Sequence, residues 1–138
     1  MVPQQEQKKK ELEKTEINAI KLLFDLPLRT PTPAIIYSFG LLYTTLRIEQ
    51  QQLIYLWKIL SKESGHWTKE ILAETRTIGV GWGKMVEDLP ARYNLPSDFH
   101  EIASQRKNEW TGRVKAAIEK RNKERLLADC HKEINGQN

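Results

Sequence analysis

The stretch Thr45-Leu-Arg-Ile-Glu-Gln-Gln-Gln-Leu-Ile-Tyr-Leu-Trp-Lys-Ile-Leu-Ser61 decides the fold class of this chain. Its apolar residues recur at helical spacing and form one face, made of Leu46, Leu53, Trp57 and Leu60 and widened by Ile54, Leu56 and Ile59. The polar residues Arg47, Glu49, Gln50 and Gln51 lie mostly opposite. This pattern predicts an amphipathic helix whose leucine-rich face packs in a core.

A second helix is predicted upstream, over Gln4–Asp25, and Pro27 stops it. Its apolar stripe comprises Leu12, Ile17, Ile20, Leu23 and Phe24. The prolines of residues 26–32 predict an extended turn, because each also disfavours helix in the residue before it. Thr32 is then expected to cap a short helix over Pro33–Phe39, which ends at Gly40.

Downstream of the central helix, the sequence predicts several shorter helices and one long one. Helices are expected over Thr68–Arg76 and Lys84–Tyr93, the second with an interruption possible at Pro90. Between them, a glycine turn over Gly79–Gly83 is expected to let Trp82 pack on the core. Ser97 is expected to cap a short helix ending near Ala103. The last helix spans Gln105–His131, with Trp110, Val114, Ala117, Ile118 and Leu126 or Leu127 on its apolar side. The tail at 135–138 is expected to fray.

These segments together predict an all-α protein, an irregular bundle of about five to seven helices with a long basic C-terminal helix. No run alternates apolar and polar residues as a strand does. With 138 residues the chain fits a single helical domain or fragment. Its expected parts are residues 1–25, 26–32, 33–63, 64–104, 105–132 and 133–138.

Composition narrows the class of protein further. The chain has 29% charged residues, a net charge of +4 and a mean hydropathy of −0.60, and its aromatic content argues against disorder. Its single cysteine excludes an internal disulfide. No apolar run approaches the roughly 20 residues of a membrane span, and no signal sequence is recognised. We therefore expect an intracellular protein, nuclear or cytoplasmic, without a membrane partner.

Two features could carry catalysis or metal binding, and neither fits. Gly79–Lys84 lacks the spacing, the preceding strand and the Ser or Thr of a phosphate-binding loop, so a helix-to-helix turn is the better interpretation. Cys130 and His131 are adjacent and project about 100° apart on a helix, so they cannot form a zinc site alone. We predict no catalytic residue, no metal and no cofactor.

The basic residues carry more information about function. The segment Gln105–Lys132 contains nine Lys and Arg residues against four Asp and Glu, a net charge of +5 that accounts for the charge of the whole chain. Lys120–Arg125 projects cations on several sides of the helix, which suits contact with a phosphate backbone. A solvated outer face with helical Glu–Lys pairs explains the same pattern equally well. The aromatic residues Tyr37, Phe39, Tyr43, Tyr55 and Trp57 are interpreted as core rather than as a base-stacking platform.

The ordered set of segments from Ile20 to His131 resembles a known family. Leu26-Pro-Leu-Arg-Thr-Pro-Thr-Pro-Ala-Ile-Ile-Tyr-Ser-Phe-Gly-Leu-Leu42, Arg47-Ile48 and Gln52–Leu60 look like the region after the polymerase core in non-LTR retrotransposon polyproteins. His66–Lys69, Gly81–Lys84 and Arg125–His131 resemble the same region in invertebrate elements.

The resemblance implies a helical segment downstream of a reverse transcriptase that helps to hold RNA template or target DNA. It implies phosphate contacts by six cations: Arg29, Arg47, Lys120, Arg121, Lys123 and Arg125. The paired aspartates of the polymerase are missing, since no Asp-Asp pair occurs. Polymerase activity therefore does not transfer to this chain, while the upstream polymerase region is an expected partner.

Two functions remain open from the sequence. The first is a non-catalytic fragment of a retroelement polyprotein that binds RNA or DNA without sequence readout. The alternative is a protein-interaction or oligomerisation module, supported by the wide apolar face from Leu46 to Leu60. The sequence does not determine the oligomeric state.

Overall fold

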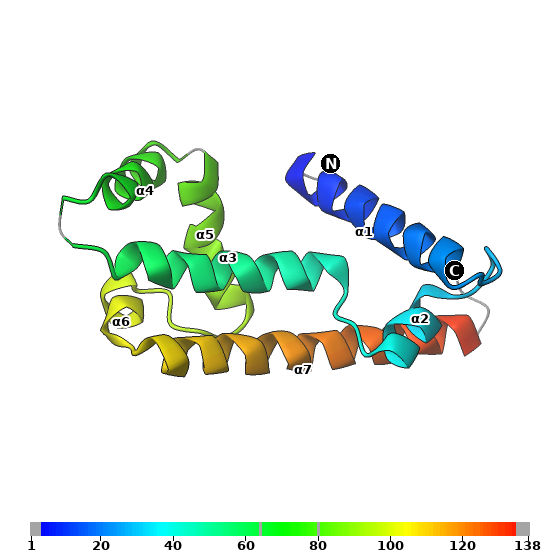
Figure 1. The fold of residues 1–138 in the computed structure, drawn as a ribbon. Coiled ribbons are helices and arrows are strands. Elements are labelled where there is room, and N and C mark those ends of the chain that lie inside the picture. Colours follow the sequence, from blue (N-terminus) through cyan, green and yellow to red (C-terminus); the bar gives the residue numbers. More distant parts are fainter. Residues whose placement is uncertain (1–3, 64, 80, 135–138) are drawn as a thin grey trace. The chain divides into compact units, whose positions relative to one another are not determined.

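A computed structural model describes residues 4–63, 65–79 and 81–134. The described residues form seven helices and no strand, which confirms the all-α prediction and the long C-terminal helix (Figure 1). The helices are α1 (Gln4–Leu23), α2 (Thr32–Phe39), α3 (Thr44–Leu60), α4 (Trp67–Ile78), α5 (Gly81–Arg92), α6 (Phe99–Ser104) and α7 (Lys107–Ile134). Within the part of the chain that is described, no helix is long and apolar enough to cross a membrane.

The chain divides into two compact units. Unit 1 comprises Met1–Ile48 and Glu119–Asn138, and unit 2 comprises Glu49–Ile118. Helices α3 and α7 each contribute residues to both units.

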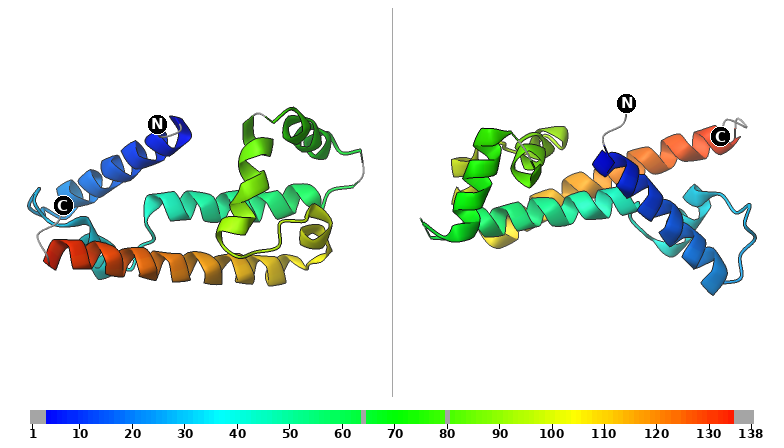
Figure 2. Two further views of the ribbon diagram at one scale, coloured as in Figure 1. Left: turned by 180° about the vertical axis from the view of Figure 1, so that it is seen from behind. Right: turned by 90° about the horizontal axis from the view of Figure 1, so that it is seen from above.

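The core of unit 2 lies between the later part of α3 and the first part of α7, which run antiparallel side by side (Figures 1 and 2). Leu53 and Leu56 of α3 and Trp110 of α7 are fully buried. The indole Nε1 of Trp110 donates to the carbonyl oxygen of Leu53 at 2.9 Å, so this buried polar group keeps a partner. Trp57 Nε1 donates similarly to the carbonyl oxygen of Gln105 at 2.9 Å.

The leucine face predicted for the central helix is confirmed. Leu46, Leu53, Leu56, Ile59 and Leu60 are all buried, and Trp57 is half-buried. On α7, Trp110, Val114 and Ile118 are buried as predicted, and Ala117 is half-buried. Of the two leucines offered for the end of this side, Leu126 is half-buried and Leu127 is exposed. These buried side chains are spaced as one face of each helix requires.

Unit 1 is organised around the junction between α2 and α3. Ile35 and Ile36 of α2 and Tyr43 are buried here. The buried side chain of Asn122, on α7, serves the backbone of this junction. Its Oδ1 accepts from the N–H of Tyr43 at 2.9 Å, and its Nδ2 donates to the carbonyl oxygen of Leu41 at 3.2 Å. A single amide therefore satisfies two backbone groups that no helix satisfies.

The start of α2 differs from the prediction. Pro31, not Thr32, occupies the N-cap position, and Thr32 is already helical, with no side-chain cap bond. The ring of Pro31 fixes φ at −63° with ψ at 139°, so the chain is extended there and the helix begins one residue earlier than expected. Gly40 ends the helix in the left-handed conformation, at φ 61°, as predicted.

The glycine turn is shorter than predicted, because α5 begins at Gly81. Gly79 closes α4 at φ 81°, and its N–H donates to the carbonyl oxygen of Thr75 at 2.9 Å. Gly83 lies inside α5, where an added Cβ would overlap the side chain of Thr75 and lie 2.6 Å from the backbone nitrogen of Arg76. Gly83 is therefore needed for the close approach of α5 to α4. The predicted packing of the Trp82 side chain lies outside the described side chains.

The remaining helix ends also shifted. Helix α5 continues through Pro90 to Arg92 without interruption. Asp98, rather than Ser97, caps α6, and its Oδ1 accepts from the N–H of His100 at 3.1 Å. A carboxylate suits this place because it faces the positive end of the helix.

Two sets of residues predicted to be buried are only partly buried. Of the predicted apolar stripe of α1, Ile17 is buried and Ile20 is half-buried, while Leu12, Leu23 and Phe24 are exposed. The helix ends at Leu23, so Phe24 no longer follows its stripe. Of the five aromatic residues assigned to the core, Tyr43 is buried and Trp57 half-buried, but Tyr37, Phe39 and Tyr55 are exposed. Helical spacing alone overestimated burial here, because it does not show whether another element covers a given face.

The role of Asn122 gives a prediction for stability. Replacing Asn122→Leu keeps the side-chain volume but leaves the Tyr43 N–H and the Leu41 carbonyl without their partner, so the free energy of unfolding should fall by about 1–3 kcal/mol. Asn108, on the exposed side of α7, is the matched control, and Asn108→Leu should change it by less than about 0.5 kcal/mol. Urea denaturation followed by circular dichroism measures both values. Equal effects of the two substitutions would contradict the role of Asn122.

Candidate functional site

Arg125 of α7 is the most heavily engaged of the six predicted phosphate contacts. Its terminal nitrogens donate to the two carboxylate oxygens of Glu13 at 3.1 and 2.9 Å, in a bidentate pair. Its Nε lies 3.7 Å from Asp129 Oδ2, and its Cζ lies 3.7 Å from the ring centroid of Tyr43. A guanidinium held by two carboxylates and an aromatic ring is fixed in place and has already lost much of its affinity for another anion.

Tyr43 completes this cluster. Its hydroxyl donates to Asp129 Oδ2 at 2.8 Å. Burial, the hydrogen bond to Asp129 and the negative charge of Asp129 all raise the pKa of the Tyr43 phenol well above its ordinary value, and the charge of Arg125 opposes them. The cluster therefore holds a neutral phenol between a carboxylate and a guanidinium.

Arg47 is engaged in a similar way. Its Nη1 donates to Glu16 Oε1 at 3.0 Å, and its Nη2 pairs with Glu16 Oε2. Glu13 and Glu16 lie three residues apart on α1, so one face of this helix holds an arginine of α7 and an arginine of α3. Arg47 and Arg125, both predicted to contact nucleic acid, thus connect α1 to the rest of unit 1 through ion pairs.

The other four cations also have exposed side chains, as the paired Arg47 does. Arg29 lies in the segment between α1 and α2, while Lys120, Arg121 and Lys123 lie on α7, and all four are exposed. Lys123 Nζ is 3.9 Å from Glu119 Oε1, but both side chains are mostly exposed, so water screens this pair. Lys120, Lys123 and Arg29 are accordingly the residues best placed to meet an anion from solution.

A shallow hollow in unit 1 brings two of the predicted residues together. It has a volume of about 460 Å³, and Arg29 and Arg125 both line it. Lys132 adds a third cation, but Glu13, Asp129 and Glu133 add three carboxylates. The hollow has balanced charge and does not select anions by itself. Lys120 and Lys123 do not line it.

Exposed apolar side chains gather in unit 1 between the end of α1 and α2. We call Leu22, Leu23, Phe24, Leu28 and Phe39 the exposed apolar set. Leu23 and Leu28 are 80% and 74% exposed, and the rings of Phe24 and Phe39 contact each other with centroids 4.7 Å apart. Neighbouring exposed apolar side chains of this kind mark contact surfaces on soluble proteins. This feature was not evident from the sequence, because helical spacing predicted Leu23, Phe24 and Phe39 to be buried.

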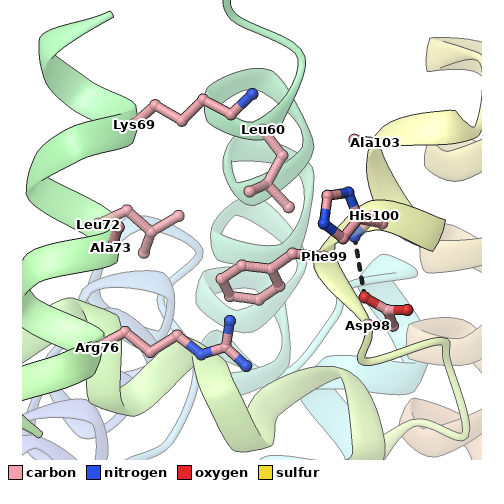
Figure 3. A pocket seen from close by; sticks show the side chains of 9 residues that line it. All are labelled: Leu60, Lys69, Leu72, Ala73, Arg76, Asp98, Phe99, His100 and Ala103. Carbon is pink, nitrogen blue, oxygen red and sulfur yellow. Dashed lines mark hydrogen bonds between the residues drawn. The ribbon is translucent and has the colours of Figure 1, made fainter. Parts of the chain in front are cut away.

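Unit 2 contains a cavity of about 270 Å³ that the sequence analysis did not identify (Figure 3). Leu60, Leu72, Ala73 and Ala103 provide its apolar surface together with the ring of Phe99. Its charged side chains are Lys69 and Arg76 of α4 and Asp98, the cap of α6, and His100 also lines it. These residues lie as far as 43 positions apart in sequence, from Leu60 to Ala103, so only folding brings them together.

The histidines and the cysteine do not converge. His66 caps α4, with its Nδ1 accepting from the N–H of Thr68 at 3.3 Å. Cys130 is half-buried and His131 exposed on α7. Among the residues that the structure describes, no group of three or more His, Cys, Asp or Glu side chains is placed to hold a metal ion.

Comparison with protein-family models, with curated proteins and with solved structures finds no match for this chain.

The Tyr43 cluster predicts a dependence of stability on pH. The pKa of Tyr43 is higher in the folded chain, so its contribution is fully present below the ordinary tyrosine pKa of about 10. As the pH rises further, the unfolded chain loses the phenol proton while the folded chain keeps it, and the free energy of unfolding should fall. Urea denaturation at about pH 9 and pH 11 measures this fall.

Tyr43→Phe should reduce the fall in stability, because it removes the titrating group. Tyr55→Phe is the control, since Tyr55 is exposed on α3, and it should keep the wild-type dependence. An identical fall in wild type and Tyr43→Phe would disprove the role of this phenol.

Proposed function

We propose that this chain is a non-catalytic helical segment that binds RNA or DNA through phosphates, without reading sequence. The observation that carries the proposal is the exposure of Arg29, Lys120 and Lys123 in unit 1. Exposed, flexible cations suit a polyanion, because each phosphate contact releases counterions and requires no fixed geometry. The resemblance to the region after the polymerase in non-LTR retrotransposon polyproteins supports the same role.

The structure divides the six predicted residues into two groups. Arg47 and Arg125 pair with Glu16 and Glu13, so we assign them to holding unit 1 together. Arg29, Lys120 and Lys123 are the proposed contacts, and Arg121 is exposed beside them on α7. In this proposal the protein acts inside the cell, where its nucleic acid is found, and an upstream polymerase region would supply any catalysis.

Salt dependence tests this function. Binding of the full chain to a fluorescent single-stranded RNA and to a DNA duplex should weaken steeply as salt rises. The triple variant Arg29→Gln, Lys120→Gln and Lys123→Gln should bind more weakly, and the slope of log affinity against log salt should become shallower by about 2–3. Circular dichroism checks that the variant folds.

A control with the same loss of charge separates specific contacts from net charge. Lys62, Lys107 and Lys115 are exposed cations of unit 2, and replacing all three by glutamine should have the smaller effect. Equal loss in both triple variants, binding independent of salt, or no binding at about 50 mM salt would each refute the proposed contacts.

A second candidate function is a protein-interaction module, and the exposed apolar set favours it. Covering a leucine that is now 80% exposed removes apolar surface from water, which stabilises a complex by about 25 cal/mol per Å² of that surface. The partner would be a protein with an apolar face, such as the polymerase region upstream or a second copy of the chain.

Sedimentation velocity tests the case of a second copy. If the exposed apolar set forms the interface, the wild-type chain should associate as its concentration rises, and Leu23→Ser with Leu28→Ser should shift it toward monomer. Leu127→Ser replaces an equally exposed leucine outside the set and should leave the association unchanged. A wild-type monomer at the highest soluble concentration would argue against self-association.

A further inference from the structure

The cavity of unit 2 has an apolar interior. Leu60 and Leu72 are buried, and the ring of Phe99 lies in the centre of the lining residues (Figure 3). Its volume of about 270 Å³ is close to the lower limit of roughly 300 Å³ for pockets that bind small molecules. The space therefore suits a compact ligand with an apolar body rather than a polymer.

Two cations, Lys69 and Arg76, line one side of this cavity. Lys69 and Arg76 are seven residues apart on α4, which places them on the same face and about 10 Å apart along the helix axis. Leu72 and Ala73 lie between them in the lining. A ligand whose apolar body rests against this stretch of α4 meets a positive charge at either end.

Arg76 is held in position by an aromatic ring. Its Cζ lies 4.1 Å from the centroid of Phe99, within the range of a cation–π contact. The guanidinium keeps N–H donors besides the Nε that faces Glu87, and a carboxylate can bind such donors in bidentate fashion. Holding the cation in this way lowers the entropy lost when an anion binds.

The carboxylates near these cations are Glu87 and Asp98. Glu87 Oε1 forms an ion pair with Arg76 Nε at 3.9 Å, and because both side chains are about 40% exposed, water screens this pair. Asp98 uses its Oδ1 to cap α6. Lys69 Nζ donates to the carbonyl oxygen of Lys62 at 3.3 Å, which uses one of its three N–H donors. The lining thus has two cations against one carboxylate that serves a helix end.

We propose that this cavity binds a small organic carboxylate, with a compact aromatic or branched aliphatic body against Leu72 and Phe99 and its carboxylate on Arg76 or Lys69. This site is independent of the proposed nucleic-acid contacts, because it uses only residues of unit 2. Its test can therefore fail while the nucleic-acid proposal stands, and the reverse is also true.

The experiment titrates the full, ¹⁵N-labelled chain with 3-phenylpropionate and follows backbone amide shifts by NMR. We expect saturable shifts at Leu72, Phe99 and Ala103, with a Kd on the order of 0.1–1 mM for a ligand of this size. The neutral amide of the same acid should bind at least about fivefold more weakly, and acetate, which lacks the apolar body, should not saturate.

Variants separate the charge from the cavity. Arg76→Gln and Lys69→Gln should each weaken binding of 3-phenylpropionate several-fold, whereas Lys115→Gln, an exposed cation of α7 in the same unit, should not. Ala103→Leu should fill the cavity and abolish binding while both cations remain. The amide spectrum and thermal unfolding of each variant report whether it folds.

Four results would overturn the proposal, three of them in binding strength. These three are equal affinity for the carboxylate and its amide, unchanged binding by a folded Ala103→Leu variant, and no saturable shift up to about 20 mM ligand. Shifts spread over the surface of α7 instead of the cavity would identify the binding as nonspecific charge attraction and would also reject the site.

Discussion

Helix α7 must keep one narrow face buried, and this constraint organises both units. Trp110, Val114, Ile118 and Asn122 follow one another at intervals of four residues, and all are buried. The first three fill the core of unit 2, whereas Asn122 serves the backbone between α2 and α3 in unit 1. Because an α-helix has 3.6 residues per turn, side chains four residues apart lie along one stripe of the helix. Most residues outside this stripe of α7 are exposed. The many charges of α7 follow from that division.

The position of a cation relative to the buried face of α7 also affects whether its side chain is available to a ligand. Arg125 lies at the edge of the buried face, where Glu13, Asp129 and the ring of Tyr43 hold it. Lys120 and Lys123 lie on outer faces and stay in solvent. Arg47 forms a bidentate pair with Glu16 although its side chain is 47% exposed, so pairing with carboxylates of α1, rather than burial, distinguishes Arg47 and Arg125 from these lysines. Net charge alone does not separate these two kinds of cation.

The features that suggest binding lie in different units and call for different partners. In unit 1, the exposed apolar set would suit a protein, and the exposed cations suit a polyanion. In unit 2, Arg76 and Phe99 contact each other and line one edge of a small cavity between α4 and α6. The close approach of α4 to α5 at Gly83 fixes one side of that region.

The sequence by itself determined the helices, the leucine face of α3 and the buried side of the first half of α7, because these follow from local periodicity. The end of α2 at Gly40 was also predicted from the sequence, since a helix end in the left-handed conformation favours glycine. Only the tertiary structure decided that Phe24 and Tyr37 are exposed. It also decided that Glu13 pairs with Arg125 and Glu16 with Arg47. The lining of one cavity by Lys69, Arg76 and Phe99 likewise depends on the tertiary structure. Burial and ion pairing depend on which distant segment lies opposite a residue, and the spacing along one helix carries no information about that segment.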